Sequence, residues 1–450
     1  MRALIQFLDE RLPLRTPLRA FLSDPQPSSV GWHHTLGSAL LFLLIVQFLT
    51  GGVLLLFYAP TPDHAWASLR HLEEHNKPGD LVRGIHVWGA SFMIVVATLH
   101  ILRVVFAGAY KRPRELNWMV GMVSFLLILG FAFTGNFLPW DQKGYWATRV
   151  GTEMISTGPL LGPFLADFLR GGEEIGAYTL SRFFALHVFF LPGLLVGATL
   201  LHLYLLRKHK IARDPLSDGK GERTIPFYPE QMLRDSTASL VVLVLLLVVA
   251  ILFPPGLEAG ADLSDTSYDP RPEWYFLAHY ELLRVMPGPP VVATVVLPTL
   301  IILALLALPL LDTGPSRNWG HRKLAVFSLV ALFAGMYATS AYSKIYHSGE
   351  RVQISEEALP LPESDNPQQM IRARQVLIHY ECVNCHRLRD QGGLVGPDLS
   401  QAGWKFSREH LRQQILNPRA SNPDSRMPVF EGRISEEDLA ALVEYLSLML

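Results

Sequence analysis

The segment Cys382-Val383-Asn384-Cys385-His386 contains the two cysteines of this 450-residue chain. A Cys-x-x-Cys-His segment is typical of covalent haem attachment, in which Cys382 and Cys385 form thioethers and His386 binds the iron. A zinc site needs four ligands, usually with a second Cys or His pair, and the chain has no such pair at a suitable spacing. The motif therefore favours a c-type haem over zinc.

A sixth ligand for this haem is predicted at Met427, which stands 41 residues after His386 in the segment Ser425-Arg426-Met427-Pro428. The separation is similar to that of small class I cytochromes c. A thioether ligand raises the reduction potential of the iron, as an electron acceptor needs. The alternative is a buried methionine that fills a gap in a core, but the polar neighbours of Met427 make that a poor core position.

Four histidines stand at matched spacings inside two apolar runs. His86 and His100 are fourteen residues apart, and His187 and His202 are fifteen apart. At 1.5 Å per residue each pair spans about 21 to 22 Å of helix, so that one histidine lies near each membrane face. Fourteen residues return to within about 40° of the starting direction and fifteen overshoot by about 60°. A kink at Pro192 and Gly193 would absorb this mismatch. We therefore expect two stacked haem sites, each with two imidazole ligands.

Glycines and arginines accompany these histidines. Four glycines repeat the fourteen-residue period in two other apolar runs, and we expect them to let a flat macrocycle approach the backbone: Gly37, Gly51, Gly121 and Gly135. Four arginines beside the histidines are candidates to pair with haem propionates: Arg83, Arg103, Arg114 and Arg207. A single intramembrane histidine is as often an interhelical hydrogen-bonding residue, and the arginines alone also fit ordinary charges at a membrane face. The matched periods favour haem.

These residues must be positioned by membrane-spanning helices. Half of the residues are hydrophobic, 18% are charged and the mean hydropathy is +0.24, whereas about a quarter of the residues in soluble domains are charged. Apolar runs long enough to cross about 30 Å of hydrocarbon occur at about 36–58, 84–106, 117–138, 183–206, 237–253, 291–311 and 324–342. The predicted fold class is all-α, a seven-span bundle followed by a small all-α domain.

Loop charges predict the orientation. With the N-terminus in the cytoplasm, eighteen Lys and Arg residues lie on the inner side and nine on the outer side, as the positive-inside rule requires. The C-terminal domain then lies outside, which in the bacterial inner membrane is the periplasm, where c-type haem is attached. The first 23 residues mix charges with Leu and Phe and indicate an amphipathic surface helix rather than a cleavable signal. A net charge of −1 argues against nucleic acid as a partner.

The expected domain boundaries follow from these patterns. They give a surface helix at 1–30, a four-helix dihaem domain at 31–213 and a three-helix domain at 214–345. A polar, proline-containing linker is expected at 346–366, and the c-type domain at 367–450, with helices at about 368–380, 406–416 and 435–449.

Residues 1–345 resemble cytochrome b of the quinol-oxidising cytochrome bc and bf complexes. Besides the histidines, the resemblance rests on the run 139–147, Pro-Trp-Asp-Gln-Lys-Gly-Tyr-Trp-Ala, and on 272–275, Pro-Glu-Trp-Tyr. The fifteen-residue histidine spacing and the seven spans are similar to the bf branch, in which the first four and the last three spans are separate proteins. That branch carries a haem-binding cysteine where Thr35 stands here. We therefore expect two b haems and no third membrane haem.

The resemblance implies roles for further residues. It pairs His86 with His187 at an outer haem and His100 with His202 at an inner one. It makes Glu273, with Tyr275 as its partner, the proton acceptor of an outer quinol-oxidation pocket that is also walled by residues 144–155. Glu273 also fits a helix N-terminus with proline in the first turn. Asp235 matches the acidic residue of an inner quinone-reduction site, with Arg207 as a second candidate, although Asp235-Ser236 also fits a helix cap.

The predicted function is that of the membrane core of a proton-translocating quinol:cytochrome c oxidoreductase with bifurcated electron transfer. The chain has no Rieske cysteine-histidine pairs, so the resemblance implies a separate Rieske 2Fe-2S protein, together with membrane quinol and quinone, a soluble cytochrome c or other acceptor, and a homodimer. Two alternatives remain open at this point. One is a dihaem anchor that relays electrons between quinone and a partner enzyme without bifurcation, and the other is a non-catalytic haem-binding assembly or sensor protein.

Overall fold

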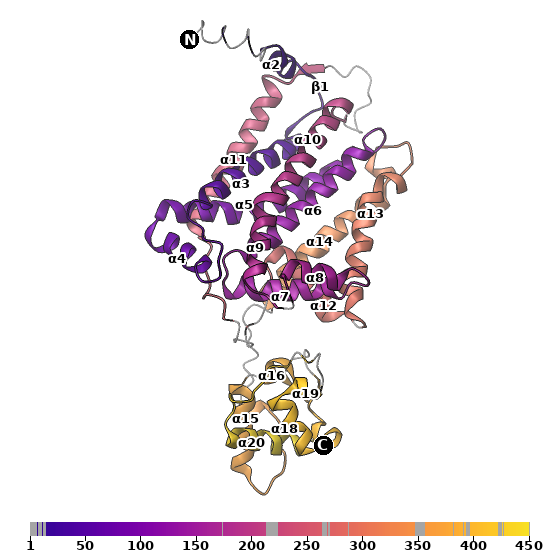
Figure 1. Ribbon diagram of the computed structural model, residues 1–450. Helices are drawn as coiled ribbons and strands as arrows, with labels where there is room; N and C mark the ends of the chain where they lie inside the picture. Colours follow the sequence, from indigo (N-terminus) through magenta and orange to yellow (C-terminus); the bar gives the residue numbers. More distant parts are fainter. Residues whose placement is uncertain are drawn as a thin grey trace. The chain divides into compact units, whose positions relative to one another are not determined.

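The computed structural model describes residues 15–172, 174–212, 224–262, 271–286, 288–346, 356–380, 382–389, 397–421 and 427–449, together with Phe7, Arg11, Tyr268, Gln391, Gly392 and Ser425. They form two compact units (Figure 1). The first comprises the described residues within Met1–Asp262 and Pro270–Ile345, and the second those within Leu263–Asp269 and Tyr346–Leu450.

Seven helices of the first unit are long and apolar enough to cross a membrane, which confirms the predicted fold class. They are α3 (Leu36–Leu54), α5 (Lys77–Phe106), α6 (Glu115–Phe137), α9 to α10 (Ala177–His209), α11 (Glu230–Leu252), η3 with α13 (Val292–Leu311) and α14 (Lys323–Tyr346). Helix α5 begins seven residues before its apolar run. Asn76 caps it by accepting a hydrogen bond from the Gly79 amide at 3.0 Å, and a proline occupies its first turn, which are both favourable starts for a helix.

Shorter elements connect the spans. The helices are α2 (Arg15–Leu22), η1 (Trp32–His34), α4 (Ala65–His75), α7 (Gln142–Ser156), α8 (Gly162–Arg170), α12 (Trp274–Val285) and η4 (Trp319–His321). Strand β1 (Pro25–Pro27) pairs antiparallel with β2 (Thr224–Pro226). The N-terminal helix therefore ends at Leu22 and does not extend to residue 30, because the chain turns there to form β1.

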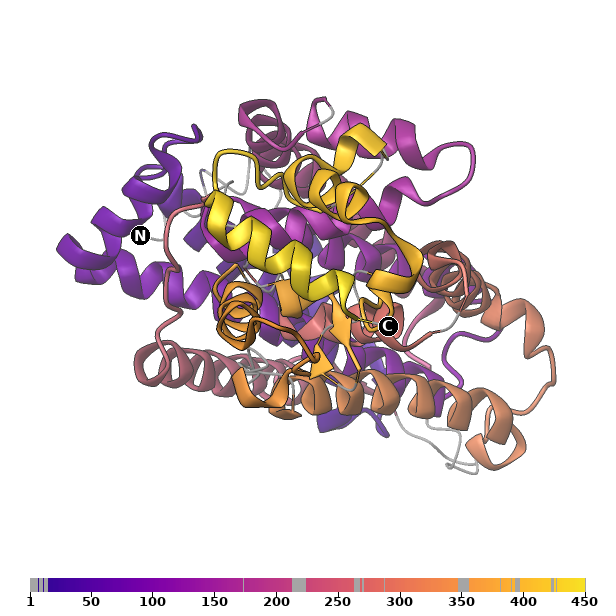
Figure 2. The ribbon, with the colours of Figure 1, turned by 90° about the horizontal axis from the view of Figure 1, so that it is seen from below.

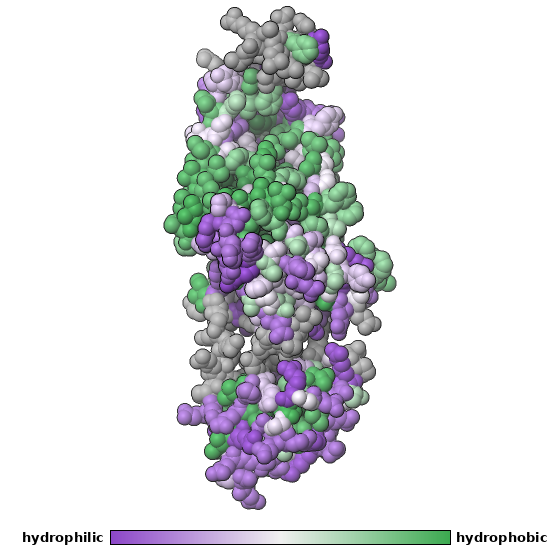
Figure 3. All heavy atoms as spheres, turned by 60° about the vertical axis from the view of Figure 1, so that its left-hand side comes forward, coloured by the Kyte–Doolittle hydropathy of each residue, from purple (hydrophilic) through white to green (hydrophobic). Residues whose placement is uncertain are grey.

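The outer surface of the spanning helices is apolar. Large hydrophobic side chains face outward from α3, α10 and α11, including Leu49, Leu200 and Leu240. Figure 3 shows such a hydrophobic surface on one face of the unit. A helix that is apolar all round matches a hydrocarbon environment, in which outward-facing apolar groups carry no hydration cost. The first unit is therefore a multi-pass membrane domain.

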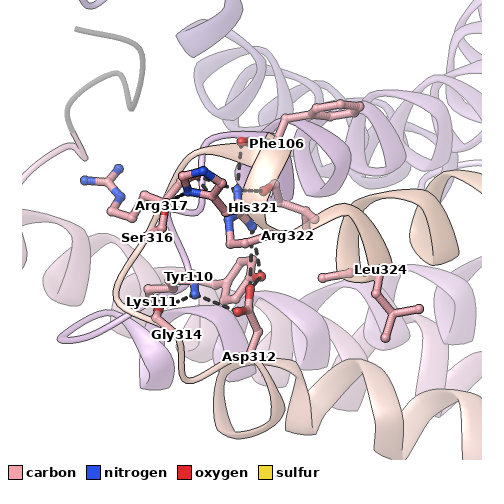
Figure 4. Close-up of polar contacts among 12 residues, drawn as sticks. Phe106, Tyr110, Lys111, Asp312, Gly314, Ser316, Arg317, His321, Arg322 and Leu324 are labelled. Atoms are coloured by element: carbon pink, nitrogen blue, oxygen red, sulfur yellow. Dashed lines mark hydrogen bonds and ion pairs between the residues drawn. The ribbon is translucent and has the colours of Figure 1, made fainter. Parts of the chain in front are cut away.

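A polar cluster joins the first four spans to the last three (Figure 4). Asp312, after α13, accepts hydrogen bonds from Tyr110 and from Lys111, the latter at 2.6 Å, in the loop between α5 and α6. Arg322 is buried, donates to the Tyr110 hydroxyl at 3.0 Å and binds carbonyls in the last turn of α5. Burial opposes ionisation of Asp312, but the hydrogen bonds and the two cations lower its pKa. The carboxylate therefore stays charged and ties the two halves together.

The second unit is a small helical domain built on α15 (Pro367–His379), α18 (Arg408–Leu416) and α20 (Glu436–Ser447) (Figure 2). Its shorter elements are η5 (Glu356–Ala358), α16 (Cys382–Cys385), α17 (Ala402–Lys405), α19 (Pro418–Ser421) and the paired strands β3 (Arg387–Leu388) and β4 (Gln391–Gly392). Leu359 belongs to its core, and the Tyr445 hydroxyl donates to the Pro360 carbonyl at 2.5 Å. Part of the segment expected to be a linker is therefore packed into this domain.

Candidate haem and quinone sites

Helix α5 carries His86 and His100, and the fourth span carries His187 and His202. The fourth span is not a continuous α-helix, because Leu186–Phe190 forms a π-helical turn that contains His187 and directly precedes α10 (Leu191–His209). A π turn holds one more residue than an α turn. It absorbs the one-residue difference between the two histidine spacings, so the mismatch is resolved by a π turn beside Pro192 rather than by a kink alone.

The rings of His86 and His187 face each other across the bundle. Their centroids are 6.3 Å apart and their planes are inclined by 72°. Two metal–imidazole bonds in line occupy about 4 Å, and the distances from the ring centres to the coordinating nitrogens fill the remainder. The spacing therefore fits one metal atom held between the two rings. His100 and His202 form the second pair, since they also lie within electrostatic range of each other.

Each of the four glycines faces one histidine ring. The clearances, measured from a Cβ placed on the glycine to the Cε1 atom of the ring, are 3.4 Å for Gly37 and His100, 3.1 Å for Gly51 and His86, 3.2 Å for Gly121 and His202, and 2.7 Å for Gly135 and His187. The last value is shorter than side-chain carbons tolerate. The nearest neighbour of each glycine is thus the imidazole ring. The sequence predicted instead that these glycines would let the haem macrocycle approach the backbone.

Threonines that precede two of these glycines orient the first pair of rings. Thr50 Oγ1 lies 2.9 Å from His86 Nδ1, and Thr134 Oγ1 lies 3.1 Å from His187 Nδ1. Each hydroxyl also donates to the carbonyl four residues earlier in its helix, so its oxygen is left to accept from the ring N–H. This arrangement leaves Nε2 of both rings available for iron, as hydrogen-bonded metal ligands commonly are.

The second pair is supported differently. His202 Nδ1 lies 3.1 Å from the Asn117 carbonyl oxygen, a backbone atom of α6. Sequence reasoning missed both kinds of support. The repeated Thr-Gly pairs at 50–51 and 134–135 could have indicated the first kind of support. The second kind could not be predicted, because every residue has a backbone carbonyl whatever its side chain.

The four arginines have different surroundings. Arg83 is buried, donates to the Pro255 carbonyl at 2.5 Å and pairs with Asp80 at 3.2 Å. Arg114 binds carbonyls at the end of α10, and Arg207 lies over the Phe21 ring at 4.7 Å. Arg103 lies within electrostatic range of His100. Arg83 and Arg114 therefore hold loops and helix ends in place, and Arg103 puts a positive charge beside a candidate histidine ligand.

Glu273 and Tyr275 lie at the start of α12, next to the first histidine pair. The Tyr275 hydroxyl accepts a hydrogen bond from Asn136 at 3.2 Å, and Asn136 directly follows the glycine that faces His187. Burial and the nearby Glu273 carboxylate raise the pKa of Tyr275, so the phenol keeps its proton and remains a donor. These contacts connect the predicted outer pocket with the first histidine pair.

Glu273 occupies the N-cap position of α12, and its side chain contacts Lys143 Nζ at 2.5 Å. Pro272 precedes the helix, so proline does not occupy the first turn, in contrast to the alternative expectation. Residues 144–155, the other expected wall of the pocket, lie in α7. The buried residues of this helix include Tyr145 and Trp146. It is capped by Asp141, which accepts from the Gly144 amide at 2.8 Å.

Asp235 lies inside α11 and not at a helix cap, because the helix begins at Glu230. It hydrogen-bonds to Ser38 and accepts from Gln231 Nε2 at 2.8 Å. Ser38 directly follows Gly37, which faces His100. Asp235 is therefore connected to the second histidine pair through two adjacent residues of α3, Ser38 and Gly37.

In the second unit, Cys382 is the first residue of the short helix α16, and His386 lies between this helix and β3. His386 Nδ1 lies 2.8 Å from the Pro397 carbonyl oxygen, which leaves Nε2 for iron. Cys382 is half-buried and Met427 packs against the domain core while remaining partly exposed. The side chain of Cys385 lies outside the described residues. The donor set of an imidazole, a thioether and a cysteine fits a c-type haem.

Comparison with known proteins places this geometry in a family. Residues 21–210 match the family model Cytochrome b/b6/petB, residues 260–358 match Cytochrome b(C-terminal)/b6/petD, and residues 369–446 match Cytochrome C oxidase, cbb3-type, subunit III. The chain is 34% identical over 333 residues to a cytochrome b of Rickettsia conorii, an alignment that covers 72% of this chain and 82% of that protein. The chain belongs to the cytochrome b family.

This cytochrome b has further relatives. It is 42% identical over 221 residues to the menaquinol:cytochrome c reductase cytochrome b subunit of Geobacillus thermodenitrificans, which covers 47% of this chain and 98% of that protein. Its fold is similar to a chain of a hyperthermophilic respiratory Complex III, with a TM-score of 0.69 and 25% identity over 84% of this chain and 96% of that one. The resemblance to cytochrome b fused to a cytochrome c domain is confirmed, and with it b haems in the membrane unit and haem c in the C-terminal domain.

Proposed function

We propose that this cytochrome b is the membrane core of a quinol:cytochrome c oxidoreductase with a bifurcated outer reaction. The observation that carries the proposal is the connection of Tyr275 to Asn136, which follows the glycine packed on His187. It supports a pocket at Glu273 beside one histidine pair, where a quinol would give up an electron to a bound cofactor. The printed names of the relatives, a menaquinol:cytochrome c reductase subunit and a Complex III chain, support the same reaction class.

Two bis-histidine b haems and one haem c are proposed for this chain. His86 with His187 would hold the outer b haem and His100 with His202 the inner one, and Thr35 would bind no further haem. Cys382, Cys385, His386 and Met427 would hold the haem c. When bound, these groups carry single electrons between the outer site, the inner site and the C-terminal domain. Arg103 and Arg207 would balance the charge of propionates at the inner face.

At the outer site, quinol must lose two protons together with its two electrons. Glu273 is suited to accept a hydrogen bond from a quinol hydroxyl and to take its proton, since it lies at a helix start and is partly exposed. The protonated Tyr275 supplies a donor that orients the substrate. A separate Rieske 2Fe-2S protein would accept one electron and pass it to the C-terminal domain, and the histidine pairs of this chain would hold the haems that take the other toward the inner site.

At the inner site, Asp235 is proposed to supply a proton to quinone. Its hydrogen bonds to Ser38 and Gln231 hold it one residue away from the glycine that faces His100. Proton uptake inside and release outside would make the reaction proton-translocating. The proposed setting is the bacterial inner membrane, with a cytoplasmic N-terminus, a periplasmic C-terminal domain, a homodimeric complex and a soluble cytochrome c or other acceptor.

The substitution Glu273→Gln tests the proposal. The amide keeps the size of the side chain but cannot accept the proton, so quinol:cytochrome c turnover of the purified complex should fall by about 100-fold or more, the usual contribution of a general base. The b and c haem absorbance should remain unchanged. Full turnover in the Gln variant would contradict bifurcation at this site and would favour the simple electron relay.

A further inference from the structure

The ion pair between Lys143 and Glu273 joins two segments that are 130 residues apart in the chain. Lys143 Nζ lies 2.5 Å from Glu273 Oε1, and the two side chains are 36% and 29% exposed. Lys143 belongs to the first turn of α7, and Glu273 is the N-cap residue of α12. The contact therefore joins the two helices proposed to wall the outer pocket, and both side chains are partly exposed.

A lysine in the first turn of a helix needs a compensating partner. The N-terminal end of a helix carries a partial positive charge, which disfavours a cation there. Asp141 lies within electrostatic range of Lys143, but its carboxylate is already engaged in capping α7 through the Gly144 amide. Glu273 provides the direct contact to the ammonium. The position of Lys143 is thus explained by its pairing with Glu273 rather than by the helix that carries it.

This pairing conflicts with the role of Glu273 in quinol oxidation. A carboxylate that accepts a proton loses its charge and with it most of its attraction to the ammonium. We propose that Lys143 is a positioning residue that holds the Glu273 carboxylate between turnovers, yields it to the quinol hydroxyl, and recaptures it once its proton has left. The inference rests on the proposed function of the outer pocket.

The step balances in protons and electrons. The O–H bond of the quinol hydroxyl breaks, its proton forms an Oε–H bond on Glu273, and its electron leaves to the Rieske protein of the proposed function. The neutral carboxyl group separates from Lys143 while it holds the proton. The proton then passes to water at the exposed edge of the pair, and the restored carboxylate returns to the ammonium.

The substitution Lys143→Met separates this role from simple packing, because methionine keeps an unbranched side chain of most of the length and removes the charge. Quinol no longer competes with the ammonium, so the KM for a short-chain naphthoquinol should fall about twofold to fivefold, the range expected for a partly exposed ion pair. The Glu273 carboxylate no longer returns to a cation after it has released its proton, so kcat should fall by about the same factor. Lys143→Arg should keep both constants within about twofold of wild type.

Lys210 offers a matched control, because it also forms a partly exposed ion pair between distant segments, with Asp24 at 2.6 Å. Lys210→Met should leave KM and kcat unchanged. Unchanged constants in Lys143→Met, or equal losses in the Met and Arg variants, would overturn the proposed role of the charge.

A double-mutant cycle keeps this inference distinct from the proposed function. In the Glu273→Gln background Lys143 has no carboxylate to hold, so Lys143→Met should have no further effect on kcat. Additive losses would overturn the inference while leaving the function of Glu273 intact. If Glu273→Gln alone leaves turnover unchanged, the proposed function fails and the role of Lys143 fails with it. Haem absorbance of every variant checks that the protein is folded.

Discussion

The two histidine levels of the membrane unit are built on the same plan with different chemistry. At each level, one glycine faces a histidine, and the residue after that glycine hydrogen-bonds to a candidate quinone-site residue. These hydrogen bonds join Tyr275 to Asn136 at one level and Asp235 to Ser38 at the other. The rings at the first level are oriented by threonine hydroxyls, but His202 at the second level is oriented by a backbone carbonyl. The glycine period therefore fixes where the rings lie, while separate contacts fix how they are turned.

The largest effect is expected from removing one ligand at either level. The wild-type chain should give two b haems and one c haem in a pyridine haemochrome spectrum. His187→Ala should lose one b haem and keep the other, and His202→Ala should do the same at the second level, because each ring pair is proposed to hold its own haem iron. Loss of both b haems in either single variant would show that the two levels do not bind haem independently.

A smaller effect is expected where a glycine is filled. Gly135→Ala places a methyl group about as close to His187 as the 2.7 Å clearance allows, and such overpacking typically costs about 1–3 kcal/mol. Occupancy of the first b haem should fall by about 10-fold or more in a haem titration. Gly37→Ala, with a 3.4 Å clearance, is the matched control and should bind nearly normally. Equal losses in both variants would break the link between clearance and occupancy.

The smallest effect is expected from the threonines, and it should be confined to the first level. Thr134→Val removes the acceptor for the His187 ring N–H, and loss of such outer contacts commonly weakens metal binding by about 10-fold. The measurement is the haem affinity together with the potential of each b haem. Ser124→Ala on the same helix is the control, because Ser124 binds the Val120 carbonyl in the same local way. A shift of both haems in Thr134→Val would contradict separate support of the two levels.

Much of the site was predictable because helical geometry is local. The spacings of the histidines and glycines follow from a fixed rise and rotation per residue, so they could be read before any contact was known. The first residues of the helices were harder to predict. The run at 237–253 belongs to a helix that begins at Glu230, because polar residues near a membrane face extend a helix without adding hydropathy. That difference moved Asp235 from a possible cap to the interior of α11.

The sequence by itself determined the seven spans, the level of each histidine and the haem-attachment motif, because each depends on residues that are close together along the chain. Only the tertiary structure decided which distant groups meet. The pairing of Lys143 with Glu273, the bond from Asn136 to Tyr275 and the ring support from the Asn117 carbonyl each join separate helices. The π turn at His187 likewise depends on how the fourth span packs in the bundle. Such contacts depend on how whole helices pack, and no local pattern of residue types specifies them.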